Sequence, residues 1–156
     1  MISRLLWGVA AGAAGTTALN AVTYLDVVAR ARPASSTPEE TVKKTEELTP
    51  LTLSSDGADS EPAQNRRTGL GALLDIATGL GTGAVYGLVR PQLGRVPLAR
   101  LALAAGLGAN VGSVAPMTAL GVDDPRSWSA SSWLSDLVPH LAYGAVAAAI
   151  FERLGR

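Results

Sequence analysis

The stretch SDLVPHLAYG, residues 135–144, places three side chains that could do chemistry inside an otherwise apolar segment. Asp136 and His140 are four residues apart, so on a helix they share one face. Pro139 lies between them, lacks a backbone N–H and clashes with the carbonyl of Ser135. Carbonyl oxygens freed in this way can accept bonds from a side chain, water or a cation. We therefore predict a polar, hydrated notch in this segment.

The notch allows three interpretations, which the sequence leaves open. In the first, Asp136 and His140 hold helices in register through hydrogen bonds. In the second, they form a proton or cation site, because histidine titrates near neutral pH. In the third, they contact a partner subunit or a lipid head group. We take the first interpretation as the working prediction.

Other kinds of chemistry lack the residues that they need. The chain has one histidine and no cysteine, which argues against a multi-histidine zinc site, a thiolate site and a disulfide. Ser132 and Ser135 lie in no nucleophile-elbow context, and no phosphate-binding loop motif occurs. The formal net charge of +0 gives no basic surface for nucleic acid. We expect no enzyme activity, no metal, no cofactor and no nucleic-acid partner.

Four long apolar segments must position these residues. Segments 5–25 and 101–122 contain no charged side chain, segment 69–89 contains only Asp75, and segment 133–151 only Asp136 and His140. Each has about the 20 residues that a helix needs to cross a hydrocarbon core of ~30 Å. A soluble bundle is the alternative, but its helices would need a charged face. We predict an all-α polytopic membrane protein, with residues 1–156 forming a single membrane domain of four transmembrane helices.

The only long polar segment, residues 26–67, separates the first two spans. Within it, STPEETVKKTEEL predicts a short surface helix over Pro38–Leu48, in which Thr37 and Glu40 form a capping box. Two pairs have the favourable i,i+4 spacing for ion pairs: Glu39 with Lys43 and Glu40 with Lys44. The remainder is typical of a flexible connector. This insert is either a solvated loop or a docking site for a partner.

Small residues recur at intervals that bring helices together. In the second span, glycines and Asp75 lie at strict four-residue intervals, which makes one stripe on a helix. We therefore expect Asp75 to face another helix, and we expect the stripe to support packing into a homo-oligomer or a larger complex. Pro116 is expected to kink or loosen the third span. The predicted packing residues are Gly71, Gly79, Gly83 and Gly87 in the second span and Gly108 and Gly112 in the third.

Polar residues from all four spans fall in the same half of the membrane. Consecutive spans run in opposite directions, so the end of one span lies at the level of the start of the next. The half concerned is the one that faces the long insert. The predicted polar cluster consists of Asp75, Asp136, His140, Asn20, Asn110 and Ser113.

Arginines predict the direction of the chain. With four spans, the N-terminus, the connection 90–100 and the C-terminus share one side, which carries six arginines and one acid, Glu152. The positive-inside rule places both termini in the cytoplasm.

The first span also fits a signal peptide loosely, with small residues near Asn20, but its apolar run is long for one. We predict a multi-pass protein of a bacterial plasma (inner) membrane, in contact with membrane lipids and with a protein partner or a second copy.

Three short motifs give the chain a family resemblance: RPASSTPEE at 32–40, APMTALGVDDPRSW at 115–128 and VPHLAYG at 138–144. In these it resembles the YagU-like group of small bacterial inner-membrane proteins. The resemblance implies a similar number of spans and the same location. It carries over no catalytic residues, and draws attention only to His140, Pro116 and Trp128. The richness in alanine and glycine and the long acidic insert depart from that group.

Overall fold

The computed structural model describes residues 2–50 and 52–155. Within them the chain forms five α-helices, two short 3₁₀ helices and no strand, in agreement with the predicted all-α class. Four of the α-helices, α1, α3, α4 and α5, are long and apolar enough to cross a membrane. The elements in chain order are α1 (Ile2–Arg30), α2 (Thr37–Leu48), α3 (Glu61–Val89), η1 (Arg90–Leu93), α4 (Leu98–Ala119), η2 (Pro125–Ser127) and α5 (Ala130–Leu154).

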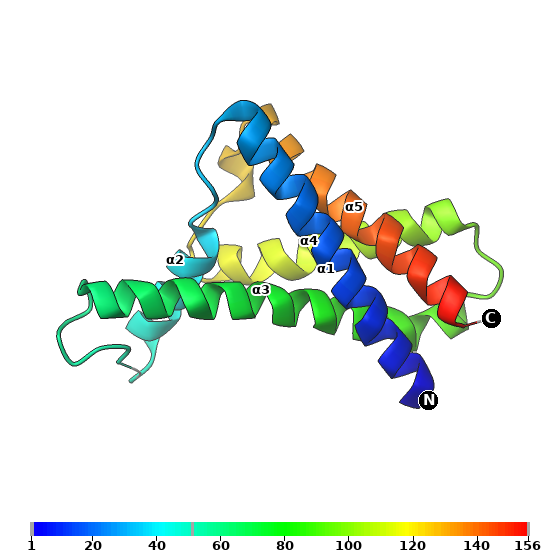
Figure 1. Cartoon of the computed structure of the whole chain (residues 1–156), viewed down its shortest axis with the longest axis horizontal. Coiled ribbons are helices and arrows are strands. Elements are labelled where there is room, and N and C mark those ends of the chain that lie inside the picture. Colours follow the sequence, from blue (N-terminus) through cyan, green and yellow to red (C-terminus); the bar gives the residue numbers. More distant parts are fainter. Residues whose placement is uncertain (1, 51, 156) are drawn as a thin grey trace.

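The first helix lies at the centre of the helix packing. α1 packs against both α3 and α5, α4 packs mainly against α5, and α2 packs against α3. Figure 1 shows α1 crossing over α3 and running beside α5, with both termini at the same end of the molecule. α3 and α4 have much less contact with each other than α1 has with either of its neighbours. The helices are thus joined in the spatial order α3, α1, α5, α4.

Two of the long helices extend into the segment that we predicted to be a polar insert. α1 continues past residue 25 to Arg30, where the Arg30 guanidinium lies 2.6 Å from the Asp26 carboxylate one turn earlier. α3 begins at Glu61, because the Ser60 hydroxyl accepts a hydrogen bond from the backbone N–H of Ala63 and caps the helix. The part of the insert outside these two helices is therefore shorter than residues 26–67.

The third long helix ends earlier than the predicted span 101–122. α4 ends at Ala119, and Gly121 adopts a left-handed φ of 68°. The N–H of Val122 then donates to the carbonyl of Met117 at 2.9 Å, and that of Gly121 to Thr118 at 3.0 Å. These two bonds are the Schellman arrangement that closes a helix at a glycine.

The predicted surface helix is present as α2, but its N-terminus differs from the prediction. The N-cap residue is Ser36, not Thr37, and its side chain makes no capping bond to the backbone. Instead the Ser36 hydroxyl donates to the Glu40 carboxylate at 2.7 Å. The predicted i,i+4 ion pairs are absent from the described residues, where the lysines pair differently: Lys44 with Glu47 and Lys43 with Asp59.

A buried ion pair holds α2 against α3. The Arg67 guanidinium donates two hydrogen bonds to one oxygen of Glu46, at 2.8 and 3.1 Å, and both side chains are about nine-tenths buried. The other Glu46 oxygen accepts a bond from the backbone N–H of Leu53 at 3.0 Å. The Leu53 N–H and the Arg67 guanidinium lower the pKa of Glu46 below its ordinary value, because both stabilise the carboxylate. α2 is therefore a docked helix and not a free one.

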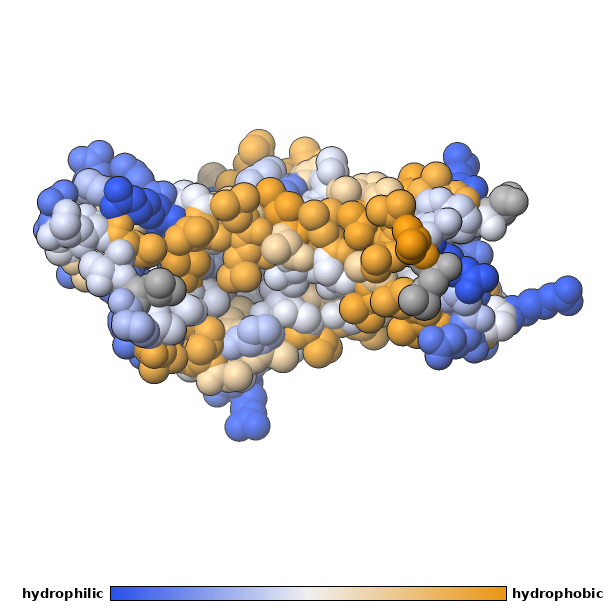
Figure 2. All heavy atoms as spheres, turned by 90° about the horizontal axis from the view of Figure 1, so that it is seen from below, coloured by the Kyte–Doolittle hydropathy of each residue, from blue (hydrophilic) through white to orange (hydrophobic). Residues whose placement is uncertain are grey.

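Apolar side chains cover the outside of the long helices. Figure 2 shows a broad hydrophobic band across the middle of the molecule, with hydrophilic residues gathered at its two ends. A soluble domain would bury such side chains, whereas a lipid-facing surface exposes them. The exposed members on α3 and α4 include Leu73, Ile76, Val85, Leu103, Leu107 and Val111.

Candidate functional site

A carboxylate that links α4 to α5 is at the centre of the candidate site. The side-chain amide of Asn110, on α4, donates a hydrogen bond to the Asp136 carboxylate on α5. Asn110 is buried, and the side chain of Asp136 is 22% exposed. Such a bond between two spanning helices fixes their register, because an unpaired carboxylate there would be costly.

His140 lies on the same face of α5 as Asp136, one turn later. Its Nδ1 lies 2.7 Å from the backbone carbonyl oxygen of Asp136 and 3.6 Å from the Asp136 carboxylate. A carbonyl can only accept, so Nδ1 carries a proton and donates it. Nε2 has no hydrogen-bond partner among the described residues.

The end of α1 approaches the same face of α5. The Arg30 guanidinium donates to the hydroxyl of Ser131 at 2.7 Å and also to the hydroxyl of Ser135. Asp26 holds the arginine in place, since its carboxylate lies 2.6 Å from both Arg30 and Arg32. The polar part of α5 is therefore connected to α4 by Asn110 and to α1 by Arg30.

A third polar link joins α5 to α3. The Tyr143 hydroxyl donates to the backbone carbonyl of Gly79 at 2.7 Å. The ring of Tyr143 is fully buried, and it packs where Gly15 on α1 leaves room for it. A side chain on Gly15 would overlap this ring, so the glycine is needed for the tyrosine to reach α3.

Three members of the predicted cluster take no part in these hydrogen bonds. Asp75 is exposed, contrary to the expectation that it faces another helix. Its position on α3 falls between Gly71, which meets α2, and Gly79, which meets α1. Asn20 and Ser113 are half-buried and make no side-chain hydrogen bond within residues 2–50 and 52–155.

The glycine stripe of α3 packs inside this chain. A Cβ at Gly83 would overlap the backbones of Gly8 and Gly12 on α1. Gly79 and Gly87 are closed in by the same helix. On α4 the expected stripe differs: a Cβ at Gly108 would meet nothing within 4 Å, and one at Gly112 would meet only Thr82, at 3.6 Å.

The close contact between α4 and α5 uses glycines that the predicted stripes omit. A Cβ at Gly106 would lie 2.7 Å from the carbonyl oxygen of His140. Gly144 likewise meets the backbones of Ala102 and Gly106. Gly106 and Gly144 lie on different helices, and neither has a second glycine four residues away, although Gly144 follows Asp136 and His140 at that interval.

Both prolines predicted to disturb a helix lie inside one. α4 continues for a further turn after Pro116, and α5 continues well beyond Pro139, which is buried. The carbonyl that gains a side-chain partner beside Pro139 is that of Asp136, through His140 Nδ1, and not that of Ser135.

Only one of the links between helices had a local signal in the sequence that the predictions missed. Asp26 and Arg30 have the i,i+4 spacing of a helical ion pair, and that pair extends α1 toward α5. The pairing of Asn110 with Asp136 depends on which faces of two helices meet, and no local spacing gives that.

No three His, Cys, Asp or Glu side chains come close enough to hold a metal ion in the described parts of the chain.

Comparison of the chain with protein-family models, with curated proteins and with solved structures gave no match. The resemblance to the YagU-like group therefore stays a prediction from the sequence.

Proposed function

We propose that this chain is a structural or accessory protein of a bacterial plasma membrane, a non-enzymatic multi-pass protein with both termini in the cytoplasm. In this role it forms a rigid four-helix unit that a second copy or a larger membrane complex uses as a building block.

The observation that carries this proposal is how the polar groups of the spanning helices are used. Asn110 bonds to Asp136 between α4 and α5, and Tyr143 bonds to a backbone carbonyl of α3. Arg30 bonds from α1 to two serines of α5. A polar group used to join helices holds the fold in one arrangement, whereas a transport path needs groups that exchange partners.

The glycines support the same role. Glycines bring the backbones of α1 and α3, and those of α4 and α5, into close contact. Gly108, on α4, faces open space in the single chain. In an assembly, this outer side of α4 is where another helix can come close without a clash.

A second candidate function is proton- or cation-linked transport. It is favoured by two groups: the exposed carboxylate of Asp75 and the Nε2 of His140, which both lack a described hydrogen-bond partner. Together with Asp136 they would form the site at which a proton or cation is held.

The two functions are separated by flux in liposomes. We expect purified wild-type protein, reconstituted with an internal pH dye, to dissipate an imposed pH gradient or a sodium gradient no faster than empty liposomes. Flux above that background, lost in Asp136→Asn and in His140→Ala, would replace the structural role with the transport role. Purification in a mild detergent then identifies the second copy or partner that the structural role requires.

A further inference from the structure

A pocket lies where α1, α3 and α5 end, on the side of the molecule that holds both termini. It has a volume of about 220 Å³ and is lined by Arg4, Trp7, Arg90, Pro91, Phe151, Glu152 and Gly155. This volume is several times the ~30 Å³ that one water molecule occupies in the liquid. The pocket is thus large enough for a small polyatomic group.

Arg90 is fixed in this pocket as a donor. Its Nε and Nη2 bond to the two oxygens of Glu152, at 2.6 and 3.1 Å, and its Nη1 bonds to the carbonyl of Gly94 at 2.9 Å. The side chain is only 16% exposed. A guanidinium has five N–H groups, and two of these take no part in the three bonds.

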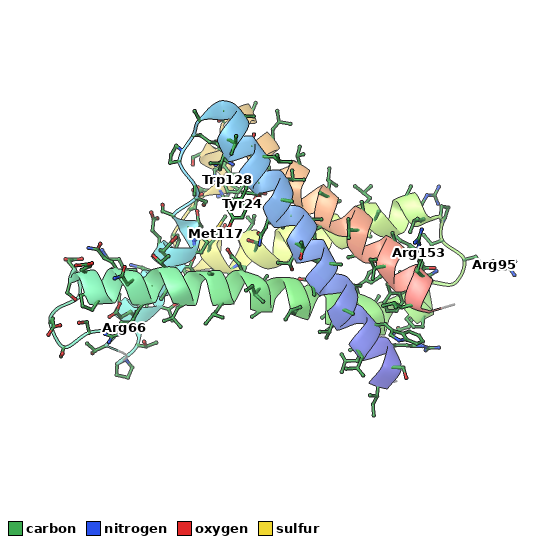
Figure 3. The ribbon with its side chains drawn as sticks, in the orientation of Figure 1. Tyr24, Arg66, Arg95, Met117, Trp128 and Arg153 are labelled. Carbon is green, nitrogen blue, oxygen red and sulfur yellow. The ribbon has the colours of Figure 1, made fainter. Side chains whose placement is uncertain are left out.

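Arg4, near the start of α1, supplies a second guanidinium to the pocket lining. It is exposed and forms no ion pair or hydrogen bond with the part of the chain that the structure describes. With one carboxylate against two guanidinium groups, the pocket lining has a net positive charge. Figure 3 shows Arg95 and Arg153 at this same end of the molecule, whereas Arg66 lies at the opposite end. The surrounding field therefore favours an anion.

The other walls of the pocket are apolar. Trp7 and Phe151 come from α1 and α5, and Pro91 follows the end of α3. A tryptophan at this depth is typical of the boundary between lipid tails and head groups. Two guanidinium groups above an apolar wall suit a ligand with an anionic head and an uncharged remainder.

We propose that this pocket binds a phosphate group, held between the guanidinium groups of Arg4 and Arg90. Guanidinium groups match the oxygens of phosphate geometrically and bind them by charge-assisted hydrogen bonds. The phosphate belongs either to an anionic membrane phospholipid or to a free phosphate ion.

The test uses the full chain in detergent with three probes: phosphatidylglycerol, phosphatidylcholine and inorganic phosphate. Native mass spectrometry counts bound lipid, and thermal unfolding measures stabilisation by each probe. We expect Arg4→Gln to weaken retention of the binding probe about tenfold, which is the effect of losing a charged hydrogen bond. Arg95→Gln is the matched control, because it removes the same charge from the same end but lies outside the pocket.

Each outcome bears on the proposal. Retention of phosphatidylglycerol over phosphatidylcholine, unaffected by inorganic phosphate and lost in Arg4→Gln, identifies a lipid phosphate. Stabilisation by inorganic phosphate, also lost in Arg4→Gln, identifies a free phosphate. Equal loss in Arg4→Gln and Arg95→Gln would show a general charge effect and overturn the site, as would the absence of binding by all three probes. Arg4→Gln is the deciding variant because Arg4 has no described bond whose loss would unfold the protein, unlike Arg90.

Discussion

At the scale of single residues, the stability of the carboxylate on α5 depends on one amide. The Asp136 side chain accepts a hydrogen bond from Asn110 on the neighbouring helix, and its other near neighbour is the His140 ring on its own helix. An acceptor that loses its donor in a membrane retains its desolvation cost without compensation. Losing the amide donor is therefore expected to cost more free energy than the hydrogen bond itself contributes to folding.

Asn110→Leu tests this dependence. We expect it to lower the free energy of unfolding by about 1–3 kcal/mol, because it leaves the Asp136 carboxylate without its amide donor. Thermal unfolding in detergent measures the effect. Ser113→Ala, on the same helix, is the control and should change little, since no hydrogen bond of Ser113 is described. Adding Asp136→Leu to Asn110→Leu should restore most of the lost stability; a double variant as unstable as Asn110→Leu would contradict the proposed pairing.

At this scale the sequence predicted some neighbours and not others. The i,i+4 spacing of Asp136 and His140 put them on one face of α5, and the structure has them in contact. Asn110, Asn20 and Ser113 were predicted to lie near them only because all five residues fall at a similar depth in the membrane. Depth fixes the position of a residue along its helix, but not the side of the helix on which its side chain lies. Only Asn110 bonds to Asp136, and Asp75 is exposed although the stripe glycines before and after it meet other helices.

At the scale of helices, the backbones of α1 and α3 come into direct contact because both helices have glycines where they meet. Gly83 faces the backbones of Gly8 and Gly12, whereas Gly81, two residues earlier on the same helix, faces open space. These two positions have the same residue type and nearly the same depth. They therefore form a matched pair that separates packing from hydropathy.

We expect Gly83→Leu to destabilise the fold and Gly81→Leu to leave it nearly unchanged. Both substitutions add the same apolar side chain and the same gain in helix propensity. Only the one at residue 83 forces α1 and α3 apart, at a cost of about 1–3 kcal/mol or more for overpacking. Melting temperatures in detergent provide the measurement. Equal melting temperatures for the two variants would contradict the observed helix contact.

The sequence located the helices better than it located their ends. Runs of apolar residues predicted the four helices that are long and apolar enough to cross a membrane, because a spanning helix must be apolar over about 20 residues. A helix continues beyond its apolar run until a cap stops it, and hydropathy does not record caps. α3 consequently begins at the Ser60 cap, and α4 stops at the Gly121 turn. The four-residue stripe of α3 predicted close packing, but the partner helix was not evident.

At the scale of the whole molecule, the structure puts the loop between α2 and α3 and the connection between α3 and α4 at opposite ends (Figure 1). Ser55 is exposed in that loop, and Arg95 is exposed in that connection. The sequence predicted this division, because the number of spans between two loops fixes whether they share a side. It predicted the side itself from the arginines alone.

Single cysteines test this arrangement on a chain that has none of its own. In intact bacterial cells, we expect Ser55→Cys to react with a membrane-impermeant maleimide and Arg95→Cys to react only after permeabilisation. The wild-type chain gives the background. The opposite pattern would place the termini outside the cytoplasm, and labelling of both positions from one side would show that α3 does not cross the membrane.

The central place of α1 has a consequence for how the protein is made. Its Gly8 and Gly12 are covered by α3 and its Gly15 by α5, which is synthesised after the other described helices. At a synthesis rate of ~5–20 residues per second, α1 waits roughly ten seconds for α5. During that interval Arg30 has not met its serines, and Gly15 has not met Tyr143. If synthesis stops before α5 is made, α1 thus remains without one of its two packing partners when it meets the insertion and quality-control machinery of the cell.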